Sequence, residues 1–197
     1  MKFLVVGSTG LIGSYVAKTL SKHGTVIGVS RTTQISVDVK DPASIKAMYE
    51  KVGKVDAVAS CIGKVAFKPV AELTYEDYLM GLKDKALGQV ELVRAGIDFL
   101  NDRGSFTLMT GVLARDPIPA GSVAALANGA IESFTLAAAI DLPRGLRINT
   151  VSPNVLVEAT SYHASFPGFH QVTAQSVADA YVKSILGKQT GQIYKLD

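Results

Sequence analysis

The sequence predicts an α/β fold, with a doubly wound parallel sheet of about seven strands and helices on both faces. Two patterns predict it: short apolar, β-branched runs recur along the chain, and stretches with the apolar spacing of an amphipathic helix separate most of them. With 48% hydrophobic and 19% charged residues, the chain can bury a large core, and no change of composition divides it. We therefore expect one domain over residues 1–197.

Seven segments are expected to be strands because they are short, apolar and mostly β-branched. Five longer segments have helical spacing, and Pro143 with Gly145 ends the fourth of them. The segments Gly111–Gly121 and Glu158–Gln171 follow strands and are expected to be loops at the carboxyl edge of the sheet, where ligands bind in such folds. The expected strands are Phe3–Val6, Thr25–Val29, Ile35–Val39, Val55–Ser60, Ser105–Met109, Arg147–Val151 and Gln192–Lys195, and the helices are Leu11–Ser21, Ala43–Lys51, Tyr75–Leu100, Val123–Leu142 and Ser176–Leu186.

A glycine-rich turn directly follows the first predicted strand. A chain that turns sharply at Gly7, lets a pyrophosphate approach the backbone at Gly10 and packs its helix closely at Gly13 is typical of dinucleotide-binding folds. The free N–H groups of the first helical turn would face the phosphates. The sequence therefore predicts a dinucleotide site formed by Gly7, Ser8, Thr9, Gly10, Leu11, Ile12 and Gly13.

Composition and charge exclude several classes of protein. The net charge is only +3 and the Lys and Arg residues are scattered among acids, so we expect no nucleic-acid partner. The single cysteine, Cys61, excludes an intramolecular disulfide, and three scattered histidines offer no metal-ligand spacing, so no metal is expected. The first apolar run is too short for a signal peptide or a membrane span, and we expect a soluble, cytoplasmic protein without membrane contact.

Four segments beyond the glycine-rich turn carry a resemblance to a known family. They are Val37-Asp38-Val39, Ser60-Cys61-Ile62-Gly63, the run from Leu146 to Pro153, and Thr190-Gly191-Gln192. In this order they resemble the short-chain dehydrogenase/reductase family, which has the Rossmann fold, over nearly the whole chain. The chain resembles a compact member that lacks the helix usually found between the second and third strands.

The resemblance implies where the cofactor lies. In the family, an Asp after the third strand contacts adenine, and Asp38 corresponds to it. The family's Asn-Asn-Ala-Gly segment corresponds to Ser60-Cys61-Ile62-Gly63, of which only the glycine matches the motif. The proline of the family's sixth strand leads toward the nicotinamide and corresponds to Pro153. The residues that the resemblance adds to the cofactor site are Asp38, Val39, Cys61, Ile62, Gly63, Asn128 and Pro153.

The end of the second predicted strand indicates which dinucleotide binds. Ser30-Arg31-Thr32 has no carboxylate where NAD-preferring proteins hold the ribose hydroxyls. A guanidinium at Arg31 can form paired hydrogen bonds to a 2′-phosphate, which Asp or Glu would repel. With Thr32 beside it, Arg31 predicts NADP(H) in preference to NAD(H); the alternative is an ordinary surface arginine at a strand end.

The resemblance fails at the family's catalytic residues. The family uses a Tyr as proton donor, a Lys four residues later and a Ser thirteen residues earlier. In this chain Ala124 stands at the Tyr position, Asn128 at the Lys position and Gly111 at the Ser position, with Thr110 adjacent. No Tyr anywhere in the chain is followed by Lys four residues later, so a shifted alignment does not restore the motif.

A rearranged set of three residues is the candidate catalytic site. Lys85 stands at the position of the family's helix Asn, and Asn128 stands at the position of the family's Lys. The two residue types have therefore exchanged places relative to the family. A partly desolvated Lys85 could donate a proton and stabilise an alkoxide, Thr110 could offer a hydroxyl, and Asn128 could bind the ribose. The alternative for Lys85 is a solvated lysine on an amphipathic helix.

Two loop histidines and two other loop residues are secondary candidates. His163 and His170 follow Pro153 in the segment that covers substrate in the family, and either could donate a proton near neutral pH. Glu158 takes the position of a Thr that helps to hold the nicotinamide carboxamide, and Thr160 is the nearby substitute. The alternative is that they are loop residues without a catalytic role.

These observations leave three functions open. The first is an NADP(H)-dependent oxidoreductase of atypical short-chain type, acting on a carbonyl or alcohol that the sequence does not identify. The second is a non-catalytic NADP(H)-binding sensor or regulatory protein, and the third is a reaction without net redox change, such as isomerisation. Since the family pairs the helices equivalent to Tyr75–Leu100 and Val123–Leu142 across a two-fold axis, a homodimer or homotetramer is expected.

Overall fold

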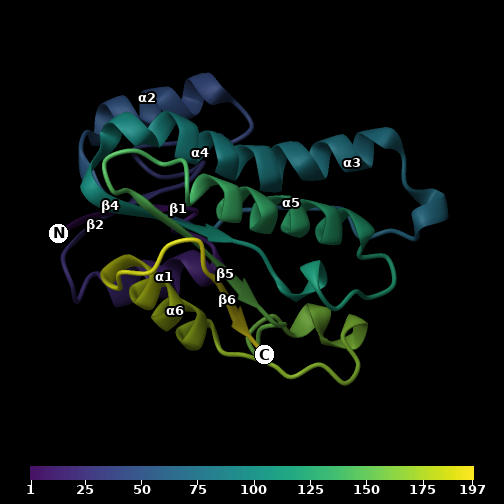
Figure 1. The fold of residues 1–197 in the computed structure, drawn as a ribbon. Coiled ribbons are helices and arrows are strands. Elements are labelled where there is room, and N and C mark those ends of the chain that lie inside the picture. The colour runs from purple at the N-terminus through teal and green to yellow at the C-terminus, as the bar shows by residue number, and fades with distance from the viewer.

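A six-stranded parallel sheet forms the centre of the computed structural model, which describes residues 1–197 (Figure 1). Its strands are ordered β2-β1-β3-β4-β5-β6, and every neighbouring pair is parallel, which confirms the predicted doubly wound sheet. The strands are β1 (Lys2–Val6), β2 (Thr25–Val29), β3 (Val55–Ser60), β4 (Leu100–Met109), β5 (Arg147–Pro153) and β6 (Ile193–Leu196).

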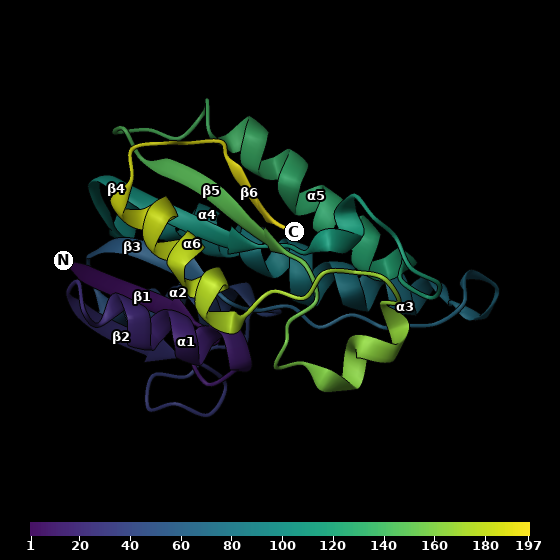
Figure 2. The same cartoon turned by 90° about the horizontal axis from the view of Figure 1, so that it is seen from below.

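Helices cover both faces of the sheet. In Figure 1, α1 (Leu11–Leu20) and α6 (Ala174–Leu186) lie below it, and α2 (Pro42–Val52), α4 (Gly88–Gly96) and α5 (Ser122–Ala138) lie above it. Figure 2 shows α1 and α6 side by side in front of the strands. None of these helices is both long and apolar enough to cross a membrane.

The interior strand β1 shows why the sheet is buried on both sides. Leu4 and Val6 point into the core beneath α2, α4 and α5, whereas Phe3 and Val5 point into the core beneath α1 and α6. All four are fully buried. Because successive side chains of a strand alternate between faces, an uninterrupted apolar run is what a strand with helices on both faces requires.

The long helix expected over Tyr75–Leu100 is interrupted. It consists of α3 (Tyr75–Gly81), a π-helical stretch over Leu82–Leu87, α4 and a 3₁₀ turn, and Leu100 already belongs to β4. Glycines stand where neighbours approach closely: a Cβ at Gly81 would lie 2.3 Å from the Val123 side chain. A π-helical stretch differs from an α-helix in that each N–H bonds to the carbonyl five residues earlier instead of four. Over a single turn this difference changes the spacing of apolar residues too little to be recognised in the sequence.

The strand expected over Ile35–Val39 is wrong. Only one isolated bridge, between Ser30 and Ser36, forms there. Side chains satisfy the nearby backbone instead, since Thr33 accepts a hydrogen bond from the Ser30 N–H (2.7 Å) and donates to the Ile35 carbonyl (2.8 Å). These local bonds replace ladder bonds, so the sheet has six strands and ends at β2.

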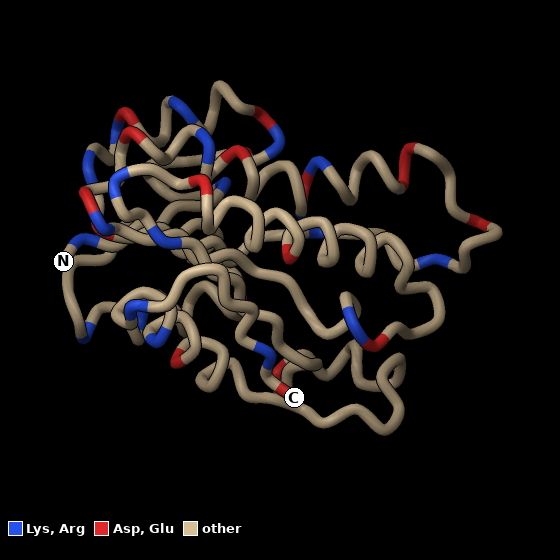
Figure 3. Tube along the Cα trace, in the orientation of Figure 1, with Lys and Arg blue, Asp and Glu red and all other residues tan.

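Charged residues are unevenly distributed over the molecule. Figure 3 shows Lys and Arg mixed with Asp and Glu around α2 and its neighbouring loops, whereas α5 and the loops that follow β5 are almost uncharged. Residues 117–131 and 159–178 contain no Asp, Glu, Lys or Arg at all. Both uncharged stretches lie near the carboxyl edge of the sheet.

Candidate active site

Two connected cavities occupy the carboxyl edge of the sheet. The glycine-loop cavity, of about 320 Å³, is lined by the turn after β1, the end of β2 and the segment around Asp38. The Lys85 cavity, of about 350 Å³, is lined by the π-helical stretch, α5 and the ends of β4 and β5. Cys61, Ile62, Gly63 and Lys64 line both, so the two form one groove across the ends of the strands.

The glycine-rich turn has the geometry that the sequence predicts. Gly7 has φ of +84°, and a Cβ on it would lie 2.6 Å from the Cys61 carbonyl oxygen. A Cβ at Gly13 would lie 2.1 Å from the Gly7 carbonyl oxygen, so only glycine lets α1 start this close to β1. Gly10 is the N-cap of α1 and supplies no capping side chain, which leaves the first N–H groups of the helix free for an anion.

Most of the residues predicted to bind the dinucleotide line this groove. Ser8, Leu11 and Gly13 do not line it; Ser8 turns inward and donates to the Val29 carbonyl (3.4 Å). The exposed Arg31 forms no ion pair, and Asp38 accepts a hydrogen bond from the Lys40 N–H (3.0 Å). Gly7, Thr9, Gly10, Arg31, Thr32, Asp38, Val39, Cys61, Ile62 and Gly63 line the glycine-loop cavity, and Ile12, Asn128 and Pro153 line the Lys85 cavity.

Lys85 projects from the π-helical stretch Leu82–Leu87 into the cavity that bears its name. Its stem lies against Gly63, where a Cβ would approach the Lys85 Cγ to 2.6 Å. The amine takes part in none of the ion pairs of the protein. Burial lowers the pKa of Lys85 to about 8, against a smaller opposing effect of Asp84. This amine can therefore give up or accept a proton close to neutral pH.

Asn128 reaches the same cavity from α5. It is 3% exposed, and its amide Nδ2 donates to the Gly111 carbonyl (3.3 Å). Its Oδ1 is buried and has no hydrogen-bond partner. Because an unpaired buried acceptor is costly, Asn128 is prepared to accept a hydrogen bond from a bound molecule. The exchange of Lys and Asn inferred from the sequence thus leaves both side chains in one cavity.

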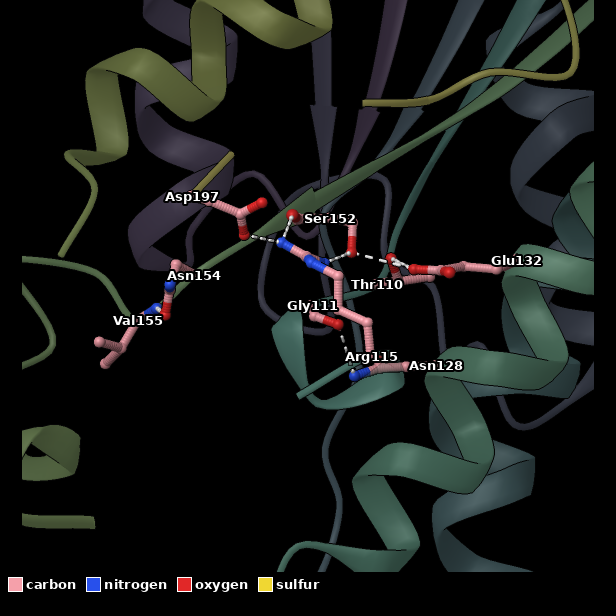
Figure 4. A network of polar contacts seen from close by, with 9 residues as sticks. All are labelled: Thr110, Gly111, Arg115, Asn128, Glu132, Ser152, Asn154, Val155 and Asp197. Carbon is pink, nitrogen blue, oxygen red and sulfur yellow. Dashed lines mark hydrogen bonds and ion pairs between the residues drawn. The ribbon is translucent and has the colours of Figure 1, made fainter. Parts of the chain in front are cut away.

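Thr110 is engaged by a residue that the sequence did not single out. Its hydroxyl donates to Glu132 Oε1 (3.0 Å), which also accepts from the Ser152 hydroxyl (3.0 Å). Arg115 donates to Ser152 (2.8 Å) and pairs with Asp197, so the chain of contacts joins α5 to the ends of β4 and β5 (Figure 4). A hydroxyl can donate only one hydrogen bond, and Thr110 donates it to Glu132, so Thr110 has no proton left to donate to a ligand.

The secondary candidates lie away from the cavity. The Glu158 carboxylate accepts from the Ala174 N–H with both oxygens (3.0 Å each), so it binds the start of α6 instead of facing the groove. His163 Nε2 is hydrogen-bonded to the Leu156 carbonyl (2.8 Å). His170 lines a separate cavity beside Arg115, and Thr160 lines neither part of the groove. No group of three or more His, Cys, Asp or Glu side chains is placed to hold a metal ion.

Cys61 stands at the junction of the two cavities, but its thiol is unreactive. Burial raises the pKa of the thiol to about 12, which keeps it protonated. The neighbouring Tyr181 hydroxyl donates to the Ser60 carbonyl (2.5 Å). Cys61 therefore contributes shape to the groove and no nucleophile.

Sequence reasoning missed the Glu132 network and two aromatic residues at the cavity. Glu132 follows Asn128 by four residues and so lies one helical turn along α5, a spacing that could have identified it. Phe67 and Tyr162, whose ring centroids are 6.0 Å apart, line the Lys85 cavity from a loop and from the 3₁₀ helix Thr160–Ser165. No local pattern brings these two residues together.

Known proteins resemble this chain over most of its length. A family model described as enoyl-(acyl carrier protein) reductase matches residues 10–191. Hydroxynaphthalene reductase arp2 of Aspergillus fumigatus is 25% identical over 175 residues, covering 76% of this chain and 64% of that protein. An uncharacterized oxidoreductase of Methylorubrum extorquens is 23% identical over 190 residues, covering 84% of this chain and 77% of that protein. The chain thus spans about two thirds to three quarters of the length of these relatives.

Solved structures match the whole chain. One is the crystal structure of the protein lin1944 from Listeria innocua, whose sequence is 48% identical to this chain. The structural alignment covers 100% of both chains, with a TM-score of 0.98. A small-chain dehydrogenase in complex with NADPH is 26% identical, with a TM-score of 0.89 over 100% of this chain and 96% of that one.

Proposed function

Because the chain belongs to the short-chain dehydrogenase/reductase family of oxidoreductases, which bind a nicotinamide cofactor, we propose that it is an atypical member that uses NADP(H) to interconvert a carbonyl and an alcohol. The observation that carries the proposal is that Lys85 and Asn128 share one cavity although the Tyr-x-x-x-Lys pair is absent from the sequence. The rearranged pair offers a titratable cation and an unpaired acceptor in place of the phenol and lysine.

The residues present fit a dinucleotide. The uncapped first turn of α1 suits the pyrophosphate, and Arg31 stands free at the end of the groove where a ribose 2′-phosphate would be bound. The orphaned Oδ1 of Asn128 suits a ribose hydroxyl. When bound, the nicotinamide supplies or accepts the hydride.

Lys85 is proposed to be the acid and base of the reaction. With its pKa lowered to about 8, it is largely protonated at neutral pH and can donate to an alkoxide as the carbonyl is reduced. In the reverse direction, the neutral amine accepts the hydroxyl proton. Its positive charge also stabilises the developing alkoxide before proton transfer.

Thr110 is proposed to orient groups in the site as an acceptor. Because its proton is donated to Glu132, it presents lone pairs only and cannot donate to a carbonyl oxygen in this arrangement. It can accept from a hydroxyl, an amide N–H or the Lys85 ammonium. Proton donation is thereby left to Lys85.

The proposal is tested by the consumption of NADPH with a panel of ketones and aldehydes. Lys85→Met should lower kcat by about 100-fold, the usual contribution of a general acid. Lys83→Met is the matched control, since Lys83 lies two residues earlier on the same π-helical stretch and is exposed. Tight NADPH binding without turnover of any compound would instead identify a non-catalytic NADP(H) sensor, and full activity of Lys85→Met would reject Lys85 as the acid.

The proposed assembly is a homodimer or homotetramer of a single-domain, cytoplasmic protein. α5 and the π-helical stretch expose large apolar side chains, namely Leu87 at 57%, Leu126 at 47% and Leu136 at 54% exposure, which supports their pairing with a second copy. Sedimentation at micromolar concentration measures the mass, and a monomer would contradict this part of the proposal.

A further inference from the structure

Few polar side chains of the Lys85 cavity are free to bind a substrate. The Lys85 amine takes part in no ion pair and Asn128 Oδ1 has no hydrogen-bond partner, whereas Thr110 donates its proton to Glu132. Asn154, which also lines the cavity, uses its side-chain oxygen to accept from the Val155 N–H (2.8 Å). Because Asn128 Oδ1 is assigned to a ribose hydroxyl of the dinucleotide, Lys85 is the main polar partner left for the substrate.

The wall of this cavity is a hydrophobic cluster of its own. Val112, Leu113, Ile118 and Ala124 are buried together, and they are separate from the two cores that flank the sheet. Phe166 packs against them and, with Val112, Leu113 and Ala124, lines the cavity. An apolar wall of this kind desolvates its ligand and binds best to an apolar body.

Two aromatic rings complete the cavity from the solvent side. Phe67 is 40% exposed and Tyr162 is 48% exposed, and their ring centroids lie 6.0 Å apart at an interplanar angle of 53°. Covering exposed aromatic surface with a ligand lowers the free energy, because it removes apolar area from water. Aromatic rings also favour offset or tilted contact with a further ring.

Charge is almost absent from this side of the groove. The residues that line the Lys85 cavity include no Asp, Glu or Arg, and Lys64 and Lys85 are the only cations. Lys64 is exposed. The uncharged stretches 117–131 and 159–178 contribute Ala124, Asn128, Ala159, Tyr162 and Phe166 to the wall. A carboxylate or phosphate on the ligand would gain little from the solvated Lys64, and pairing it with Lys85 instead would take the ammonium away from the carbonyl.

We propose that the substrate is a neutral compound in which a single carbonyl or hydroxyl group is attached to an apolar ring body, of the kind represented by aromatic ketones and their alcohols. The proposal rests on the proposed function, because it places the carbonyl at Lys85. The apolar cluster and the Phe67–Tyr162 pair hold the ring. Besides Lys85, a substrate anion would meet only the exposed and solvated Lys64, so the cavity favours neutral substrates over anionic ones.

Calorimetry with acetophenone and 4-acetylbenzoate tests this specificity. The two ketones differ by one carboxylate, and titration into protein saturated with NADP⁺ measures binding without reduction. We expect acetophenone to bind at least 10-fold more tightly. Equal affinity, or tighter binding of 4-acetylbenzoate, would overturn the proposal.

Substitutions at the rim show whether the cavity itself discriminates. Tyr162→Arg adds a cation to an exposed position on the cavity, so the preference for acetophenone should fall at least 5-fold or reverse. Tyr75→Arg is the matched control, because Tyr75 is 75% exposed and does not line the cavity. An unchanged preference in Tyr162→Arg, or the same change in both variants, would reject the assignment.

The two proposals can fail separately. If neutral ketones bind preferentially but are never reduced by NADPH, the substrate class stands and the proposed oxidoreductase reaction fails. If 4-acetylbenzoate is reduced faster than acetophenone and the reduction depends on Lys85, the reaction stands and the substrate class is wrong.

Discussion

Glu132 Oε1 accepts a hydrogen bond from Thr110 Oγ1 at 3.0 Å, and this contact ties α5 to the end of β4. The same oxygen accepts from Ser152 at the end of β5 (3.0 Å). α5 also carries Asn128, one turn earlier, so the carboxylate holds the wall that bears Asn128 against the strand ends. The contact explains why the hydroxyl of Thr110, which lies next to the family's Ser position at Gly111, is not a free hydrogen-bond donor.

Removal of this carboxylate should destabilise the protein. Glu132→Ala leaves the hydroxyls of Thr110 and Ser152, which are 3% and 0% exposed, without their acceptor. We expect a loss of about 2 to 3 kcal/mol in the free energy of unfolding, measured by urea denaturation. Glu132→Gln, which keeps an oxygen acceptor, should lose less than half of that, and Glu50→Ala, on the exposed face of α2, should lose almost nothing. Equal stability of Glu132→Ala and wild type would refute the network.

The pH dependence of turnover should follow Lys85. Carbonyl reduction requires the protonated amine, so kcat should fall as the pH rises through about 8, while alcohol oxidation should rise over the same range. Initial rates from pH 6 to pH 10 measure both limbs. In Lys85→Met both limbs centred near this pH should disappear, and limbs that persist would show that another group carries the proton.

The stability of the protein should depend on pH through the same residue. Burial lowers the pKa of folded Lys85 to about 8, so between there and about 10.4, its usual value, the unfolded chain binds more protons at this site. The stability of wild type should therefore increase with pH across this window, relative to Lys85→Met. Urea denaturation at pH 7.5 and pH 9.5 gives the difference, and the opposite sign would mean that Lys85 is not desolvated in the folded protein.

Gly63 should be essential for the position of Lys85. Gly63 has φ of +135°, and a Cβ there would lie 2.6 Å from the Lys85 Cγ, so Gly63→Ala strains the backbone and displaces the lysine. We expect a loss of about 1 to 3 kcal/mol in stability and a fall in kcat of at least 10-fold. The control is Gly129→Ala on α5, where nothing lies within 4 Å of the new methyl group. Unchanged kcat in folded Gly63→Ala would contradict the placement of Lys85.

Local patterns predicted most of the sheet and the glycine-rich turn. The apolar runs became strands because a parallel sheet covered on both faces needs them, as Leu4 and Phe3 show on opposite faces of β1. The prediction of a strand over Ile35–Val39 was wrong because the Thr33 hydroxyl forms hydrogen bonds with the Ser30 N–H and the Ile35 carbonyl in place of ladder bonds. The spacing of apolar residues carries no information about such local bonds.

The site was only partly predictable for a similar reason. Lys85 and Asn128 were placed by comparing positions with a family pattern, and both lie in one cavity. The role of Glu132 and the meeting of Phe67 with Tyr162 depend on contacts between segments that are far apart in the sequence. Such contacts arise from tertiary packing, so no local signal reveals them.

Calorimetric titration with NADPH and NADH is the most direct test of the central claim, because the proposed reaction requires a dinucleotide in this groove. We expect NADPH to bind with micromolar or tighter affinity and NADH much more weakly. Arg31→Ala should weaken NADPH binding by about 10- to 100-fold and leave NADH binding nearly unchanged, since charge-assisted hydrogen bonds to a phosphate are lost. Arg94→Ala, at an exposed arginine on α4, should change neither. No binding of either dinucleotide, or equal losses of both in Arg31→Ala, would contradict the account.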